Sequence, residues 1–186
     1  MTGFAHKLLI VCLLAGVSVV TLASAQSQAM PASVESYRLG PGDTIDVRVF
    51  GEDDLSLTLR LGEDGRINYA FVGEIYLENM TLLEVEQEIT RRLEGDYLLN
   101  PRVSVTMSEY RPFFIQGEVS RPGSFPYQPG LTVSKAISLA GGLTERASDR
   151  KIFLVPDGGV VADRVRVSLD DLVGPGDTLT IEQSFF

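Results

Sequence analysis

Apolar and polar positions alternate in short runs from about residue 37 onward, and this pattern predicts a chain built largely of short strands. In the first run, Ile45, Val47 and Val49 share one face and Asp46 and Arg48 share the other. The second run, at 57–61, leads into Asp64-Gly65, a dipeptide typical of a hairpin turn. Further runs predict strands at residues 102–107, 113–119, 124–127, 151–155, 163–167 and 178–181.

Helical spacing appears in the segment "TLLEVEQEITRRLEG". Thr81 and Glu84 match a capping box, and Gly95 can provide a left-handed stop. Four apolar side chains share one helical face, namely Leu82, Val85, Ile89 and Leu93. The sequence therefore predicts one amphipathic helix packed on the strands around it.

A second, shorter helix is expected after Thr132, a suitable N-cap. Its apolar face consists of Val133, Ala136, Ile137 and Ala140. Gly141-Gly142 would end it. A strand pair, a helix and further strands within about 75 residues are the order expected of a β-grasp-like domain.

These elements predict an α+β protein of two small tandem modules, residues 37–110 and 111–186, with the seam at Tyr110 and Arg111. Each module is at the small end of independent stability. We therefore expect the modules to pack on one another or on other copies of the chain.

Residues 1–25 differ from the rest, because Lys7 precedes a long apolar run that closes on Ala23-Ser24-Ala25. This is typical of a secretory signal peptide with cleavage after Ala25, followed by a small polar tether at 26–36. The alternative is an uncleaved membrane span. A lipid anchor on Cys12 is not expected, because branched residues precede that cysteine.

Cleavage after Ala25 would remove the only cysteine, Cys12, and the only histidine, His6. Residues 26–186 could then form no disulfide, no zinc site of the cysteine or histidine type, and no histidine-based triad. Loss of Lys7 would change the net charge from −9 to −10. No basic cluster stands out, so a nucleic-acid partner is not expected.

The phrase Gly-Pro-Gly-Asp occurs near the front, in "LGPGDTIDVRVF", and near the end, in "VGPGDTLTIEQSFF". Its glycines can take positive φ, and its aspartate can accept backbone N–H bonds within its own turn. A catalytic pair or a cation site is the alternative. Because a strand follows both copies at the same offset, we interpret the phrase as a turn-structural device at Gly40, Gly42, Asp43, Gly174, Gly176 and Asp177.

Other candidate chemistry is sparse. Glu52, Asp53 and Asp54 could be read as glycosidase carboxylates, but a solvated acidic loop is the better interpretation. Phe125 and Tyr127 alternate along an expected strand, where they could contact a saccharide ligand or another subunit, or pack in the core. No phosphate-binding motif, cofactor site or metal site is expected.

Basic residues occur in two groups, Arg91-Arg92 and the set Arg146, Arg150 and Lys151. A solvated helix end or loop explains both most simply. A contact between subunits is the alternative.

The order of these motifs resembles one known family. "YRLGPGDTIDVRVFG" followed by "DGRINYAFVGEIYLENMTLLEVEQEIT" resembles the first module of outer-membrane polysaccharide export (OPX) proteins. "GEVSRPGSFPYQPGLTVSKAISLAGGLTERASDRKIFLV" and "VGPGDTLTIEQSFF" resemble the soluble-ligand-binding β-grasp (SLBB) module that follows it. The resemblance covers residues 37–186.

This resemblance implies a non-enzymatic, periplasmic component of capsular polysaccharide or exopolysaccharide export. It also implies a homo-oligomeric ring and an inner-membrane polysaccharide co-polymerase as partner. With one SLBB module, no lipobox and no helix after Phe186, the chain is expected to be a short form that needs a separate outer-membrane barrel. A saccharide-binding β-grasp receptor and a glycan hydrolase or lyase are the alternatives.

Overall fold

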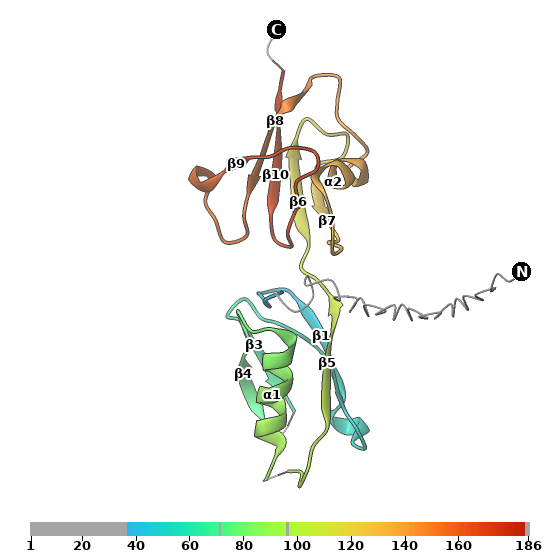
Figure 1. Ribbon diagram of the computed structural model, residues 1–186, viewed down its shortest axis with the longest axis vertical. Helices are drawn as coiled ribbons and strands as arrows, with labels where there is room; N and C mark the ends of the chain where they lie inside the picture. The colour runs from blue at the N-terminus through green and yellow to red at the C-terminus, as the bar shows by residue number, and fades with distance from the viewer. Residues whose placement is uncertain (1–36, 71, 96, 185–186) are drawn as a thin grey trace, which may run out of the picture. The chain divides into compact units, whose positions relative to one another are not determined.

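The computed structural model describes residues 37–184, with the exceptions of 71 and 96. The predicted signal peptide and tether lie outside the described residues. Within the described chain, strands and two α-helices form two groups of elements, each around its own hydrophobic cluster (Figure 1). The predicted α+β class is confirmed.

The first half contains a three-stranded antiparallel sheet of order β2-β1-β5 and a separate antiparallel pair, β3-β4. The three-stranded sheet consists of β1 (Thr44–Val49), β2 (Leu57–Arg60) and β5 (Val103–Glu109). The pair consists of β3 (Arg66–Tyr69) and β4 (Gly73–Tyr76). A short 3-10 helix at Asp53–Leu55 connects β1 to β2, and α1 (Leu82–Leu93) precedes β5.

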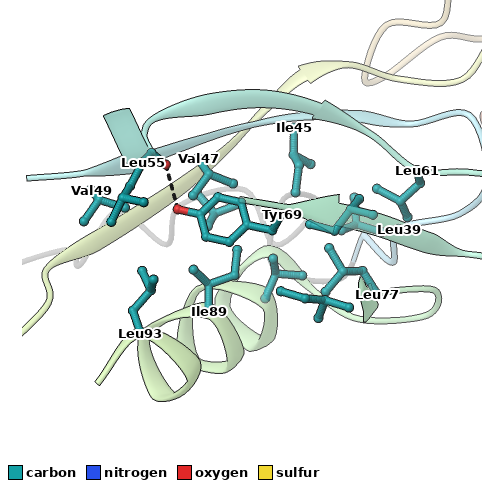
Figure 2. Close-up of a cluster of buried hydrophobic side chains, with 14 residues drawn as sticks. Leu39, Ile45, Val47, Val49, Leu55, Leu61, Tyr69, Leu77, Ile89 and Leu93 are labelled. Carbon is teal, nitrogen blue, oxygen red and sulfur yellow. Dashed lines mark hydrogen bonds between the residues drawn. The ribbon is translucent and has the colours of Figure 1, made fainter. Parts of the chain in front are cut away.

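The core of this half lies between the β1 sheet and α1 (Figure 2). Ile45, Val47 and Val49 are buried at every second position of β1, as the alternation predicts. Tyr69 is also fully buried, and its hydroxyl donates a hydrogen bond to the Leu55 carbonyl at 2.6 Å. This bond satisfies the only polar atom of the Tyr69 side chain within an apolar cluster.

The predicted start of α1 is confirmed. Thr81 Oγ1 accepts a hydrogen bond from the Glu84 amide, and the Glu84 carboxylate accepts one from the Thr81 amide at 2.7 Å. Val85, Ile89 and Leu93 are fully buried on the predicted face. The capping box and the apolar stripe together explain why the helix forms here.

Replacing Thr81 with alanine is expected to lower the free energy of unfolding by about 1 kcal/mol, because one N-terminal amide of α1 loses its acceptor. Thr81→Ser, which retains the hydroxyl, serves as the control and should stay close to the wild type. Urea denaturation measures both variants. Equal stability of the alanine and serine variants would show that the capping box contributes nothing.

The prediction of a hairpin at Asp64-Gly65 is wrong, although a turn does form there. β2 pairs with β1, and β3 pairs with β4, so the turn connects two separate ladders. The end of β2 is held by β1: Leu61 N donates to the Asp43 carbonyl at 2.8 Å, and Gly42 N donates to the Leu61 carbonyl at 3.0 Å. The turn itself is closed by the Gly65 amide, which donates to the Gly62 carbonyl at 3.0 Å, and by the Gly62 amide, which donates to the Arg66 carbonyl at 2.8 Å, but no β2-β3 ladder continues from it.

The second half contains a five-stranded mixed sheet of order β7-β6-β10-β8-β9. Its central pair, β6 and β10, is parallel, and the other neighbours are antiparallel. The strands are β6 (Phe113–Gly117), β7 (Gly123–Phe125), β8 (Ala147–Val155), β9 (Val165–Arg166) and β10 (Thr178–Gln183). The predicted second helix is confirmed as α2 (Val133–Leu139), and a 3-10 helix at Val161–Asp163 precedes β9.

Two strand predictions in this half need correction. β7 ends at Phe125, so Phe125 and Tyr127 do not alternate along one strand. Pro126 follows directly and has no N–H to continue the ladder. The strand expected at 163–167 is reduced to Val165–Arg166, because residues up to Asp163 form the 3-10 helix.

Candidate functional site

The first Gly-Pro-Gly-Asp phrase forms a closed turn around the side chain of Asp43, which is completely buried. Asp43 Oδ2 accepts hydrogen bonds from the Gly40 amide at 2.8 Å and from the Tyr37 hydroxyl at 2.6 Å. The Asp43 amide in turn donates to the Gly40 carbonyl at 3.1 Å. Gly42 has a φ of +93°, a conformation that a side chain disfavours.

The second phrase repeats this geometry at the same spacing. Asp177 Oδ2 accepts a hydrogen bond from the Gly174 amide at 2.6 Å, and the Asp177 amide donates to the Gly174 carbonyl at 3.4 Å. Gly176 has a φ of +85°. In both copies, therefore, the aspartate bonds to the glycine three residues earlier. This matches the turn-structural interpretation, which remains a prediction until the aspartates are substituted.

Arg111 and Asp157 connect the two turns. Arg111 donates to Asp43 through its backbone amide and through Nη1, both at 2.8 Å, and its Nη2 lies 2.9 Å from Asp157 Oδ2. The Asp157 amide donates to Asp177 Oδ1 at 3.0 Å. A continuous polar chain thus runs from Asp43 through Arg111 and Asp157 to Asp177, and we call it the junction network.

Side chains of the junction network lie close to two glycines of the repeated phrase, Gly40 and Gly176. A Cβ at Gly40 would lie 2.6 Å from Arg111 Nη1. A Cβ at Gly176 would overlap the Asp157 carboxyl group. The phrase therefore keeps glycine at positions 40 and 176 partly because Arg111 and Asp157 occupy the space that a side chain would fill.

The electrostatics of the junction network favour fixed charges. Burial and the hydrogen bond to Asp43 raise the pKa of Tyr37 far above its usual value, so its hydroxyl stays protonated. Burial lowers the pKa of Arg111, but the nearby carboxylates of Asp43 and Asp157 help to outweigh it and leave the pKa raised. With a protonated tyrosine and a permanently charged arginine, neither of these two side chains serves as a base or nucleophile near neutral pH.

Both aspartates stand out in the sequence as turn residues, whereas no motif singles out Tyr37, Arg111 or Asp157 as their partners. Arg111 lies at the predicted seam, but the residues around it give no indication that it binds Asp43, 68 residues earlier in the chain. The pairing is a tertiary contact, so no local periodicity or motif could reveal it.

The structure places Phe125 and Tyr127 half-buried against the second hydrophobic cluster. The Phe125 ring lies 6.0 Å from that of Phe113, and Tyr127 makes an edge contact with Tyr110 at 5.4 Å, measured between ring centroids. Packing thus accounts for both aromatic side chains. Their proposed role in ligand or subunit contact remains a prediction.

The acidic residues Glu52, Asp53 and Asp54 are exposed around the short 3-10 helix. Among the residues that the structure describes, no group of three or more His, Cys, Asp or Glu side chains could hold a metal ion. No helix in the same residues is long and apolar enough to cross a membrane.

The basic residues singled out in the sequence are mostly paired locally. Arg91 and Arg92 both contact the Glu88 carboxylate, at 2.7 and 2.6 Å. Arg146 Nη2 lies 3.4 Å from Glu118 Oε1. These contacts account for Arg91, Arg92 and Arg146 as surface ion pairs within the chain.

Two family models match the chain in succession. Residues 31–108 match the polysaccharide biosynthesis/export protein model, and residues 112–164 match the SLBB domain model. Asp43 of the junction network lies in the first match and Asp157 in the second. Arg111 falls in the short interval between them.

Curated relatives agree with these matches. The chain is 38% identical over 143 residues to the exopolysaccharide production protein ExoF of Rhizobium meliloti, covering 70% of this chain and 34% of that protein. It is 29% identical over 155 residues to the EPS I polysaccharide export outer membrane protein EpsA of Ralstonia nicotianae, covering 69% of this chain and 40% of that protein. The chain thus spans roughly a third to two fifths of these relatives. With an export domain followed by an SLBB domain, it belongs to the outer-membrane polysaccharide export (OPX) family.

Proposed function

We propose that the protein is a periplasmic, non-enzymatic component of capsular polysaccharide or exopolysaccharide export across the outer membrane. The succession of an export domain and an SLBB domain in one chain carries this proposal. The names of both relatives, which refer to exopolysaccharide production and to polysaccharide export, support it.

The role is that of an oligomeric conduit or adaptor. Copies of the chain form a ring, which contacts an inner-membrane polysaccharide co-polymerase and a separate outer-membrane barrel. A strand edge supports this proposal, because β2 has one neighbour within the three-stranded sheet and so offers backbone groups for pairing. The junction network supports it as well, since a conduit requires its two modules to hold a fixed geometry.

Deletion of the gene and complementation with the full chain test the export role. We expect the amount of extracellular polysaccharide to fall about ten-fold or more in the deletion strain and to recover on complementation. Unchanged secretion after deletion would refute the role in export. Size measurement of the purified protein, alone and with the co-polymerase, separately tests the ring, and a strict monomer in both samples would argue against it.

A further inference from the structure

The outward face of β1 carries polar and aromatic side chains that the core does not use. Ile45, Val47 and Val49 point toward α1 (Figure 2), so the residues between them face away from the core. In the ladders on either side, Asp46 is opposite Thr58 of β2 and Thr106 of β5. Facing residues share one side of a sheet, so this surface is rich in hydroxyl and charged groups.

A hollow of about 370 Å³ lies on this side of the sheet, between β1, the short 3-10 helix and the start of β2. Its volume is within the range of roughly 300–1,000 Å³ that is common for small-molecule sites. Its lining includes the side chains of Asp46, Arg48, Phe50, Asp53 and Thr58.

Phe50 is the aromatic group of this hollow, and 61% of its surface is exposed. The guanidinium carbon of Arg102 lies 5.8 Å from the centre of the Phe50 ring, and the Phe50 amide donates to the Arg102 carbonyl at 2.9 Å. An exposed ring whose one printed contact is the Arg102 guanidinium offers an apolar surface on which a ligand can stack.

The polar groups of the hollow include both donors and acceptors. Among the residues that the structure describes, Arg48 forms no ion pair, so its guanidinium group keeps donors for a ligand. Asp46 accepts a bond from the Thr58 hydroxyl, and the exposed Asp53 supplies a second carboxylate. With two carboxylates and one guanidinium group, the lining disfavours an anionic ligand and suits one without net charge.

We infer that this hollow binds a sugar unit of the exported polysaccharide, which stacks on Phe50 and exchanges hydrogen bonds with Arg48 and Asp53. A sugar hydroxyl is at once a donor and an acceptor, and a sugar ring presents an apolar face to an aromatic ring. Both properties match the lining. The inference rests on the proposed export function and adds to it a contact site in the first module.

A protein partner fits this surface less well. The cores of protein interfaces are depleted in charged residues and bury several apolar anchors. This hollow has charged side chains along its length, with Phe50 as its exposed aromatic group. A partner protein is therefore the alternative outcome that the experiment must recognise.

The test is a calorimetric titration of the full chain with oligosaccharides prepared by partial hydrolysis of the polysaccharide from the cells that produce this protein. We expect saturable binding, weakened roughly five- to ten-fold by Phe50→Ala and by Arg48→Ala. Tyr76→Ala is the matched control, because Tyr76 is also an exposed aromatic residue with an arginine, Arg66, 5.8 Å from its ring centre. Tyr76→Ala should bind like the wild type.

Salt and cell assays distinguish the remaining outcomes. Affinity should change less than about two-fold between 50 and 300 mM NaCl, since the bound sugar unit is uncharged. Secretion should fall in cells carrying Phe50→Ala and not in cells carrying Tyr76→Ala. Absence of binding, or equal binding by all variants, would overturn the sugar site. So would a secretion defect in Phe50→Ala cells without loss of oligosaccharide binding, which would indicate a protein partner. If deletion of the gene stops secretion while Phe50→Ala binds and secretes normally, the export function stands and the sugar site is wrong.

Discussion

Asp43→Ala is expected to lower the free energy of unfolding by roughly 3–5 kcal/mol, the cost of removing one partner from a buried ion pair. The Asp43 side chain is fully buried and accepts four hydrogen bonds, from Tyr37, Gly40 and two groups of Arg111. Without the carboxylate, the Arg111 guanidinium keeps only Asp157 as an ionic partner, and that residue is more exposed. The loss therefore combines an uncompensated charge with unsatisfied backbone donors.

The repeated phrase provides the matched control for this prediction. Asp177→Ala removes the equivalent carboxylate, but Asp177 accepts only backbone N–H bonds, from Gly174 and Asp157. Its cost should be about 1–2 kcal/mol. Chemical denaturation of both variants measures the difference, and Asp43→Asn should fall between them because it keeps an acceptor without the charge. Equal losses for Asp43→Ala and Asp177→Ala would contradict the assignment of Arg111 as the partner that makes the first copy special.

Local features of the fold could be predicted because their causes lie within a few residues. The start of α1 follows from a capping box that spans four residues, and its buried face follows from helical spacing. The alternation of β1 likewise gives its buried face directly. The two families matched in succession agree with the resemblance found in the motif order.

Pairing between distant segments could not be predicted in the same way. Asp64-Gly65 correctly indicated a turn, but no nearby residue indicates that β2 pairs with β1 while β3 pairs with β4. The parallel pair of β6 and β10 joins residues about 64 positions apart, and no turn motif connects the two strands directly, so no local sequence signal indicates the pairing. The junction network depends on the same kind of contact, since Asp43, which pairs with Arg111, lies 68 residues before it in the chain.

The second large effect is expected at Gly117, the last residue of β6. Its φ is +92°, and a Cβ at this position would overlap the Ile181 carbonyl oxygen of β10. That oxygen also accepts a hydrogen bond from the Glu118 amide at 3.0 Å, so the carbonyl cannot move aside without losing the bond. Gly117→Ala should therefore cost at least about 3 kcal/mol, from backbone strain and steric overlap together.

Gly158→Ala separates the two causes of that loss. Gly158 has a φ of +70°, but no atom lies within 4 Å of an added Cβ, so this variant keeps the strain and omits the overlap. Its cost should be about 1–2 kcal/mol. Denaturation measures both variants, and hydrogen exchange should show weakened protection in β6 and β10 for Gly117→Ala alone. If the two variants were equally stable, β6 and β10 would not be in the close contact that places a backbone oxygen against Gly117.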